Sequence, residues 1–332
     1  MDFSTIAAMA AGHAEARTIQ TAISLGLFDA LASEACDAGA LARAMGCEPR
    51  ATALLADALA ALGLLEKNSA KYALSDGAKR YLVAASPEYL GGMILFDAAL
   101  WDEWGRLDAA IRTGRPARDP DMFQNDAAAT ERFIRAMDSL VRARGDAAWT
   151  AAHLNLSRTR SIVDLGGGPG TYLVEFLRKH PELLGEIWDL PGTLEVARQI
   201  LHERAADVID RIELRPFDYH SDSPSNRVDA VFLSNIIHSE NERDNLRLMH
   251  TCYRALNPGG LVVIKDHVMD DAMTTPAAGA VFSLYLLLTT RGRDYSFSEI
   301  KRWLAQAGFA APEIISLPSP PFSSSIVTAV RS

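Results

Sequence analysis

The segment 163–170, Val-Asp-Leu-Gly-Gly-Gly-Pro-Gly, has the residue types and spacing of a ligand-binding turn. It joins an apolar stretch that predicts a strand, 161–165, to a stretch from Tyr172 that predicts a helix. Glycine suits a turn whose backbone takes unusual angles or approaches a ligand closely. Asp189 ends the next apolar stretch, where a carboxylate can accept hydrogen bonds from ribose hydroxyls. Together these features predict a site for a nucleoside cofactor; a glycine-rich turn without a ligand is the alternative.

The spacing of the glycines argues against a dinucleotide. A G-x-G-x-x-G loop needs its third glycine at the sixth position, so that a pyrophosphate can lie at the helix N-terminus. Counting from Gly166, that position is Thr171, and the form here is G-x-G-x-G. We therefore expect a different nucleoside cofactor.

One histidine stands where a general base is useful. A histidine with a pKa of about 6.5 is largely neutral at neutral pH and can take up a proton. Among the eight histidines, His238 follows the fourth predicted strand, four residues after Ser234. His267, just past the fifth strand, is the nearest competitor, and the others are typical of surface or helix positions.

Alternating strands and helices position these residues. From Ser161 onward, short apolar stretches alternate with helical ones, which predicts a mostly parallel sheet covered on both faces. We expect strands at 161–165, 186–189, 211–217, 228–234, 260–265 and 324–330. Ligands of such sheets gather at the carboxyl ends of the strands. The polar residues at or just after these ends are Asp164, Asp189, Asp218, Ser234 and Asp266.

The first part of the chain is mostly helical. Asp37 and Pro49 are placed to begin two helices, and 64–74 predicts a hairpin around Asn68-Ser69. Three helices followed by a hairpin is the order of a winged helix. The would-be recognition helix, 51–62, carries Asp57 as its only charge, whereas DNA recognition needs phosphate and base donors. We expect a packing element at a subunit interface instead of a DNA-binding helix.

Two further helical stretches lie between residues 93 and 155. One is led by Trp101 and ends near Gly114, and the other runs from Phe123 to Thr150 with a break at Gly145. Aromatic and apolar side chains in them could line an aromatic substrate, although ordinary helix core is an equal alternative for each. The candidates for substrate binding are Trp101, Phe133 and Met137.

Composition limits the partners and the compartment. The net charge of −9 disfavours nucleic acid and anionic membranes. The three cysteines show no metal-ligand or disulfide spacing, so we expect reduced thiols, a cytoplasmic protein and no bound metal. The longest apolar run, 277–288, is too short to span a bilayer and predicts a buried helix.

These motifs, taken in order, resemble a known family. The loop V-D-L-G-G-G-P-G resembles the first motif of class I S-adenosylmethionine (SAM) methyltransferases. Together with further motifs it resembles the small-molecule O-methyltransferases, which include caffeate, hydroxyindole and bacterial polyketide enzymes. The further motifs are D-L-P (189–191), F-D (217–218), I-I-H (236–238), A-L-N-P-G-G (255–260), Trp101-x-x-Trp104 with Thr113-Gly114-Arg115-Pro116, and Arg293-Asp294-Tyr295-Ser296 with Ala307-Gly308-Phe309.

The resemblance implies an α/β fold with two main parts: a C-terminal Rossmann-like, doubly wound sheet and an N-terminal winged-helix dimerisation domain of a homodimer. We expect the dimerisation domain at 1–110, substrate-pocket helices at 111–155 and the SAM-binding domain at 156–332. The implied function is transfer of a methyl group from SAM to a hydroxyl of a small aromatic or polyketide-like molecule of secondary metabolism, with S-adenosylhomocysteine as the other product. The implied cofactor residues are Gly166, Gly168, Asp189, Leu190, Asp218, Tyr219 and Ser234.

The implied catalytic residues are His238 as base and Asp266 and Asp294 as the acids that orient it. The family usually has glutamate at both acidic positions and aspartate-tryptophan after the histidine, where this chain has Ser239-Glu240. Ser234 stands where many relatives have lysine. These departures keep alternatives open: methylation of nitrogen or carbon, a non-methylation reaction, or a SAM-sensing regulator.

Overall fold

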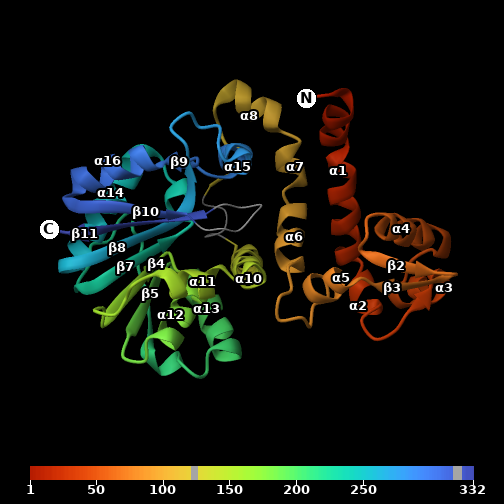
Figure 1. The fold of residues 1–332 in the computed structure, drawn as a ribbon, viewed down its shortest axis with the longest axis horizontal. Helices are drawn as coiled ribbons and strands as arrows, with labels where there is room; N and C mark the ends of the chain where they lie inside the picture. The colour runs from red at the N-terminus through yellow and green to blue at the C-terminus, as the bar shows by residue number, and fades with distance from the viewer. Residues whose placement is uncertain (121–125, 317–323) are drawn as a thin grey trace. The chain divides into compact units, whose positions relative to one another are not determined.

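The structure, a computed structural model, describes residues 1–120, 126–316 and 324–332. It divides into two compact units (Figure 1): Met1–Trp101 with Ser139–Arg144, and Asp102–Asp138 with Gly145–Ser332. Most of the segment 111–155 belongs to the second unit.

The first unit has the predicted helix and hairpin order. Asp37 caps α3, since its Oδ1 accepts a hydrogen bond of 2.8 Å from Ala40 N–H, and Pro49 is the first residue of α4. Strand β1 joins the predicted hairpin to make a three-stranded sheet of order β1-β3-β2, a strand that the sequence did not predict. The elements are α1 (Phe3–Ser24), α2 (Leu27–Ala30), β1 (Cys36–Asp37), α3 (Ala38–Met45), α4 (Pro49–Ala61), β2 (Leu65–Asn68), β3 (Lys71–Leu74), α5 (Asp76–Tyr81) and α6 (Gly91–Ala98).

The charge on α4 is used inside the unit. Asp57 Oδ1 accepts hydrogen bonds from Lys67 Nζ at 2.5 Å and from the Tyr72 hydroxyl at 2.7 Å, which ties α4 to the hairpin. Leu54 on the same helix is exposed. Beyond the exposed Arg50 at its first turn, the helix therefore offers apolar surface and no further cation for a DNA phosphate.

The second unit is built on an eight-stranded sheet with the path β10-β11-β8-β7-β4-β5-β6, and β9 pairs with β8 off this path. Strands β8, β7, β4, β5 and β6 are parallel, and β11 and β10 are antiparallel. The doubly wound, Rossmann-like sheet that we expected is thus confirmed. The strands are β4 (Ser161–Leu165), β5 (Leu184–Asp189), β6 (Ile212–Pro216), β7 (Val228–Ser234), β8 (Leu256–Met269), β9 (Tyr295–Ser296), β10 (Phe309–Ser316) and β11 (Ser324–Arg331).

Helices cover both faces of this sheet (Figure 1). On one face, Leu248 and Cys252 of α14 and Trp303 of α16 pack with Val231 and Ile264 of the central strands in one apolar core. Helices α11, α12 and α13 lie on the other face. The helices are α7 (Trp101–Trp104), α8 (Leu107–Thr113), α10 (Ala127–Arg144), α11 (Asp146–His153), α12 (Thr171–Lys179), α13 (Pro191–Arg204), α14 (Glu242–Ala255), α15 (Ala277–Thr289) and α16 (Phe297–Ala307), with short 3-10 turns η1 (Ile209–Arg211) and η2 (Ile237–Ser239).

Two helix predictions differ in detail from the structure. The stretch from Trp101 to Gly114 forms two short helices, α7 and α8, instead of one. The stretch 277–288 does form a helix, α15, but the helix is only partly buried, and Val281 is 58% exposed. The break at Gly145 is confirmed, because its positive φ of 69° separates α10 from α11. Phe123, the predicted start of α10, lies outside the described residues.

Candidate active site

The glycine loop connects β4 to α12, and its backbone requires glycine. Gly166 has a φ of 67° and Gly168 a φ of 54°, in the left-handed region that side chains disfavour. A Cβ on Gly166 would lie 2.5 Å from Ile236 Cδ1. Among the described residues, an added Cβ at Gly168 would meet only Ile134 Cδ1, at an ordinary contact distance of 3.9 Å.

Asp189 at the end of β5 is bonded to that loop. Its Oδ2 accepts a hydrogen bond of 2.9 Å from Gly168 N–H, and its Oδ1 accepts one of 2.7 Å from Leu190 N–H. Burial raises the pKa of Asp189, and these two N–H groups partly offset the effect. The two features that the sequence identified separately, the glycines and the acid, thus lie side by side at the carboxyl ends of β4 and β5.

A second buried acid, Asp164, directly precedes the loop. Burial, together with the nearby charge of Asp189, raises the pKa of Asp164 to about 8. Among the described residues its Oδ2 has no hydrogen-bond partner. The carboxyl is therefore mostly protonated at neutral pH.

The remaining predicted cofactor residues lie at the ends of β6 and β7. Asp218 accepts hydrogen bonds of 2.9 Å from His220 N–H and from the Ser221 hydroxyl, so it caps its own turn. The Tyr219 hydroxyl donates to Glu240 Oε1 at 2.8 Å. Ser234 ends β7, and its Oγ accepts a hydrogen bond of 3.1 Å from Asn235 Nδ2.

A lysine on the neighbouring strand is paired in register with Ser234. Lys265 of β8 is fully buried, and its Nζ lies 3.3 Å from Asp146 Oδ2 and 3.2 Å from Ser324 Oγ. Sequence reasoning missed this buried charge pair, which joins α11, β8 and β11. Removing one partner of such a pair is strongly destabilising, because an uncompensated buried charge remains.

His238 lies in the short turn η2 and is paired with Asp266 on β8. Its Nδ1 donates a hydrogen bond of 2.6 Å to Asp266 Oδ1, which leaves Nε2 as the proton acceptor. Burial alone lowers the pKa of His238, but the charge and hydrogen bond of Asp266 outweigh burial, and the pKa is raised above 6.5. Burial alone would raise the pKa of Asp266, but the pairing with His238 leaves it lowered.

Asp294 stands in a different relation to the histidines. It is fully buried, and its Oδ2 lies 3.7 Å from Nδ1 of His267. Burial and the neighbouring Asp266 raise the pKa of Asp294 to about 8. One ring nitrogen of His238 and one carboxylate oxygen from each of Asp266 and Asp294 lie within 4.8 Å of one another. Such a group of atoms could hold a cation. Because Nδ1 of His238 already donates to Asp266, we describe the group as a hydrogen-bonded dyad beside a neutral acid.

The turn that carries His238 is held by residues that sequence reasoning missed. The amide Nδ2 of Asn245 donates to Ile237 O at 2.8 Å and to Glu240 O at 3.1 Å, and the Tyr295 hydroxyl donates to Glu240 O at 2.6 Å. Gly292 approaches so closely that a Cβ on it would lie 2.3 Å from His238 O. The sequence did contain one signal for this support: Asn245 is a polar residue on the apolar face of α14. The structure shows that it is fully buried.

Aromatic rings from α15 line the two histidines. Phe282 meets both imidazoles edge-on, with ring centroids 5.4 Å from His238 and 4.9 Å from His267. Tyr285 stacks on Phe282 at 5.1 Å. Sequence reasoning missed both residues because it treated 277–288 only as an apolar run.

The three residues predicted to bind the substrate, Trp101, Phe133 and Met137, lie on α7 and α10. Phe133 on α10 packs against a cluster that contains Val196 and Ile200 of α13, and Met137 is half-buried on the same helix. Trp101 belongs to the first unit, where it is 40% exposed and lies 5.3 Å from the Arg17 guanidinium.

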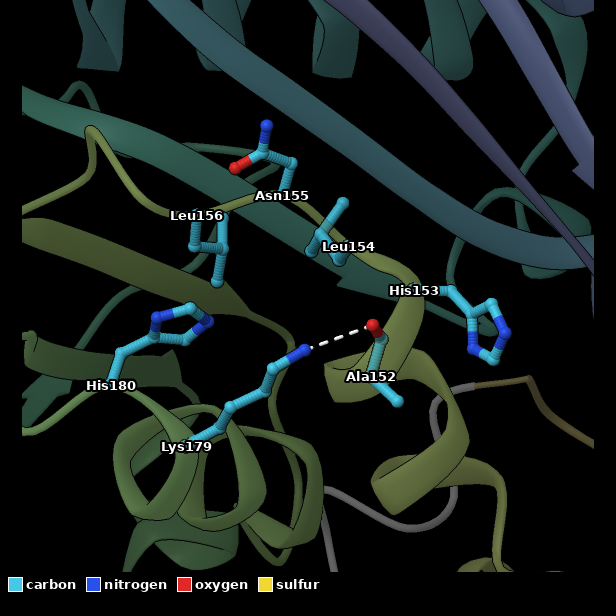
Figure 2. Close-up of a pocket in the computed structure, with 7 residues that line it drawn as sticks. All are labelled: Ala152, His153, Leu154, Asn155, Leu156, Lys179 and His180. Carbon is cyan, nitrogen blue, oxygen red and sulfur yellow. Dashed lines mark hydrogen bonds between the residues drawn. The ribbon is translucent and has the colours of Figure 1, made fainter.

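A cavity of about 250 Å³ lies elsewhere in the second unit, near the ends of α11 and α12 (Figure 2). It is lined by 152–156, Lys179 and His180. Lys179 Nζ donates to the Ala152 carbonyl at 2.9 Å, as the dashed line in Figure 2 shows, and so closes the end of α11. The lining includes none of the predicted site residues.

Comparison with known proteins identifies the family. Models of the O-methyltransferase domain and of the O-methyltransferase dimerisation domain match residues 105–310 and 8–84. The 3-hydroxy-5-methyl-1-naphthoate 3-O-methyltransferase of Streptomyces sahachiroi is 35% identical over 320 residues, which cover 94% of this chain and 91% of that protein. The N,N-dimethyltransferase OxyT of Streptomyces rimosus is 28% identical over 303 residues, 89% and 87% of the two chains.

A solved structure agrees with these matches. An O-methyltransferase family protein from Burkholderia thailandensis superposes with a TM-score of 0.86 and 28% identity, covering 100% of this chain and 98% of its own. The chain therefore belongs to the O-methyltransferase family and has a dimerisation domain at its N-terminal end. It is an enzyme, a SAM-dependent O-methyltransferase. In the described residues, none of the helices is both long and apolar enough to cross a membrane.

Proposed function

We propose that this enzyme methylates a hydroxyl of a small aromatic or polyketide-like acceptor, with His238 as general base and S-adenosylhomocysteine as second product. The observation that carries the proposal is the 2.6 Å hydrogen bond between His238 and Asp266 at the carboxyl ends of β7 and β8. These ends belong to the same sheet edge as the glycine loop, where ligands of such folds bind.

The residues of the loop suit SAM. A Cβ on Gly168 would meet no described residue closer than 3.9 Å, and Asp189 is anchored by two backbone N–H groups beside it. In this proposal Gly166 and Gly168 adjoin the amino-acid part, Asp189 accepts from the ribose hydroxyls, and Leu190, Asp218, Tyr219 and Ser234 border the rest of the nucleoside. When bound, SAM supplies an electrophilic methyl group on a sulfonium.

His238 supplies the proton acceptor. A phenol has a pKa of about 10 and is mostly protonated at neutral pH, so that a base accelerates its methylation. Nε2 of His238 takes the hydroxyl proton, while the buried carboxylate of Asp266 holds the ring in the required tautomer and stabilises the imidazolium. The turn bonds from Asn245 keep the ring in place, which favours the near-attack alignment that such a transfer needs.

The side chains around the base favour an aromatic acceptor. Phe282 and Tyr285 form an apolar wall beside His238, and stacked or edge-on contacts to an aromatic ring add to burial. The naphthoate acceptor in the name of the Streptomyces sahachiroi relative is of this class. Contacts of the acceptor with Phe133, Met137 and Trp101 remain a prediction. The role of Asp294 as an acid that orients His238 also remains a prediction.

Methylation of nitrogen is the second candidate, and one observation favours it. A relative of similar length is named as an N,N-dimethyltransferase. An amine with a free lone pair needs alignment and no base, so the same fold can serve both reactions.

We further propose that the enzyme works as a homodimer in a reducing compartment such as the cytoplasm. Apolar side chains are exposed on α1 and α4, namely Phe3, Ile6, Met9 and Leu54. Burying them between two copies would be favourable, and association through apolar surface survives high salt. The described cysteines are all unpaired. Sedimentation in 1 M salt should show a dimer at about micromolar concentration, and a monomer would contradict the interface.

Product analysis tests the proposed reaction. The purified enzyme is incubated with SAM and matched pairs of acceptors, a phenol and the corresponding aniline, and the products are identified by mass and fragmentation. We expect methyl ethers from the phenols. Methylated anilines without any ethers would favour the second candidate, and neither product from a broad phenol panel would contradict O-methylation of such acceptors.

A further inference from the structure

Two imidazole–carboxyl pairs, not one, lie at this end of the sheet. The first is His238 with Asp266, and the second is His267 with Asp294, whose Nδ1 and Oδ2 atoms are 3.7 Å apart. The parallel pairing of β8 with β9 produces the second pair: Val268 is opposite Tyr295, so the residues just before them become neighbours. His267 lies on β8 and Asp294 lies in the segment that leads into β9. The second pair is therefore held by the pairing of these two strands.

The imidazole rings of His238 and His267 both contact Phe282 of α15. Their centroids are 6.4 Å apart and their planes differ by 22°, and both meet the edge or face of Phe282. Each keeps a small exposed part, 8% for His238 and 7% for His267. The backbone N–H of His267 also donates to Asp266 Oδ1 at 2.8 Å, so the carboxylate that accepts from the His238 ring is itself bonded to the backbone of His267.

The two carboxyls differ in charge. Asp266 accepts hydrogen bonds from His238 Nδ1 and from His267 N–H and is ionised. Asp294 has a raised pKa, and among the described residues neither of its oxygens has a hydrogen-bond partner. Unequal environments for two carboxyls indicate two different roles. The first pair carries the charge that a general base needs, whereas the acid of the second pair, Asp294, is neutral and lies 3.7 Å from His267 Nδ1.

We propose that His267, positioned by Asp294, binds a second oxygen of the acceptor, next to the hydroxyl that gives its proton to His238. The acceptor class is then a one-ring or fused two-ring aromatic with two oxygen functions, one methylated and one held. Two imidazoles with centroids 6.4 Å apart can each hydrogen-bond, at about 2.8 Å, a different oxygen of one such molecule. This inference rests on the proposed function and specifies its acceptor.

A pair of naphthols tests the assignment. Initial rates are measured with 2-naphthol and with 1,3-dihydroxynaphthalene, which adds a second oxygen to the same skeleton. The wild type should show a lower KM for the dihydroxy compound. Replacing His267 by Phe, which keeps a ring and removes its hydrogen bonds, should raise that KM by about tenfold to hundredfold. The KM for 2-naphthol should change little.

Further variants separate binding from a structural role. His267→Gln, whose amide reaches the region of Nε2, should recover part of the KM, and Asp294→Asn should have a smaller effect than His267→Phe. His250→Gln, on the exposed side of α14, is the matched control and should behave as wild type. SAM affinity, measured by calorimetry without acceptor, should be the same in all variants.

Each outcome decides the inference. Equal losses of kcat for both naphthols in His267→Phe, with KM unchanged, would show a structural or catalytic role and overturn it. So would equal KM values of the wild type for the two naphthols, or no methylation of either one. The proposed function fails separately, when a broader panel of phenols gives no ethers although SAM binds.

Discussion

Nδ1 of His238 donates a hydrogen bond of 2.6 Å to Oδ1 of Asp266, and both side chains are almost completely buried. The bond links two strand ends that are far apart in sequence, and it determines which nitrogen of the ring can take a proton. It also makes Asp266 the main group that raises the pKa of His238, ahead of Asp294, which leads to the first prediction.

Asp266→Asn should move the acid limb of the pH profile. The charge of Asp266 raises the pKa of His238 against the effect of burial, so removing that charge lowers the pKa. We expect the acid limb of kcat/KM to move to lower pH. We expect kcat at the optimum to fall by less than the about 10²–10⁴-fold that a general base contributes. An acid limb unchanged in position would show that His238 is not the titrating group.

The sequence predicted the end of β7 to the residue but stopped β8 too early. We expected 260–265, because Asp266 and His267 are polar and read as the end of a strand. The strand continues to Met269. Ser325 and Ser324 of β11 pair with Asp266 and His267, and β9 pairs with Val268 and Met269. That antiparallel partner comes from the far C-terminal part of the chain, and local sequence patterns carry no information about such pairing.

The difference between local patterns and long-range strand pairing also explains which parts of the site could be predicted from the sequence. Asp189 and the glycine loop follow from strand ends and turn chemistry, which are local. The nearness of Asp294 to His267 depends on the register of β8 with β9, which is not local. The resemblance implied that Asp266 and Asp294 orient His238; the hydrogen bond to Asp266 is present, and the role of Asp294 stays a prediction.

Asp189→Ala should weaken SAM binding. The substitution removes both the expected acceptor for the ribose hydroxyls and the anchor of Gly168 N–H in the loop. Losing hydrogen bonds to a charged group costs about 1.5–3 kcal/mol, which calorimetry with SAM or S-adenosylhomocysteine can measure. Asp210→Ala, an exposed residue of the turn η1, is the control and should bind as wild type. Unchanged affinity in Asp189→Ala would remove this residue from the cofactor site.

Asp294→Asn should alter how stability depends on pH. The pKa of Asp294 is raised from 3.8 to about 8 in the folded protein, so the unfolded chain loses this proton at lower pH than the folded one. The contribution of Asp294 to the free energy of unfolding therefore falls as pH rises from about 4 to 8, and Asn removes that contribution. The difference in Tm, variant minus wild type, should grow across this range and level off above it. A constant difference from pH 4 to 9 would contradict a neutral buried acid.

Asn245→Ala should lower turnover through the turn that carries His238. The substitution leaves the Ile237 carbonyl without its side-chain donor and the Glu240 carbonyl with only the Tyr295 hydroxyl, at a cost of about 1–3 kcal/mol. We expect a lower Tm and, at temperatures well below it, a lower kcat with an almost unchanged SAM affinity. Asn257→Ala, whose amide bonds Asp229 at the opposite end of the sheet, is the control for loss of a similar bond. If kcat falls no further in Asn245→Ala than in this control, the turn does not depend on Asn245.

The central claim is that His238 removes the proton of the acceptor hydroxyl, and its direct test is the turnover of His238→Ala across acceptors of graded acidity. Phenols that ionise near neutral pH need little help, whereas those with a pKa of about 10 depend on the base. We predict a loss of kcat of about 10²–10⁴-fold for ordinary phenols, a smaller loss for nitrophenols, and an unchanged affinity for SAM. Turnover of ordinary phenols at the wild-type rate, or an equal loss for all acceptors whatever their acidity, would contradict the claim.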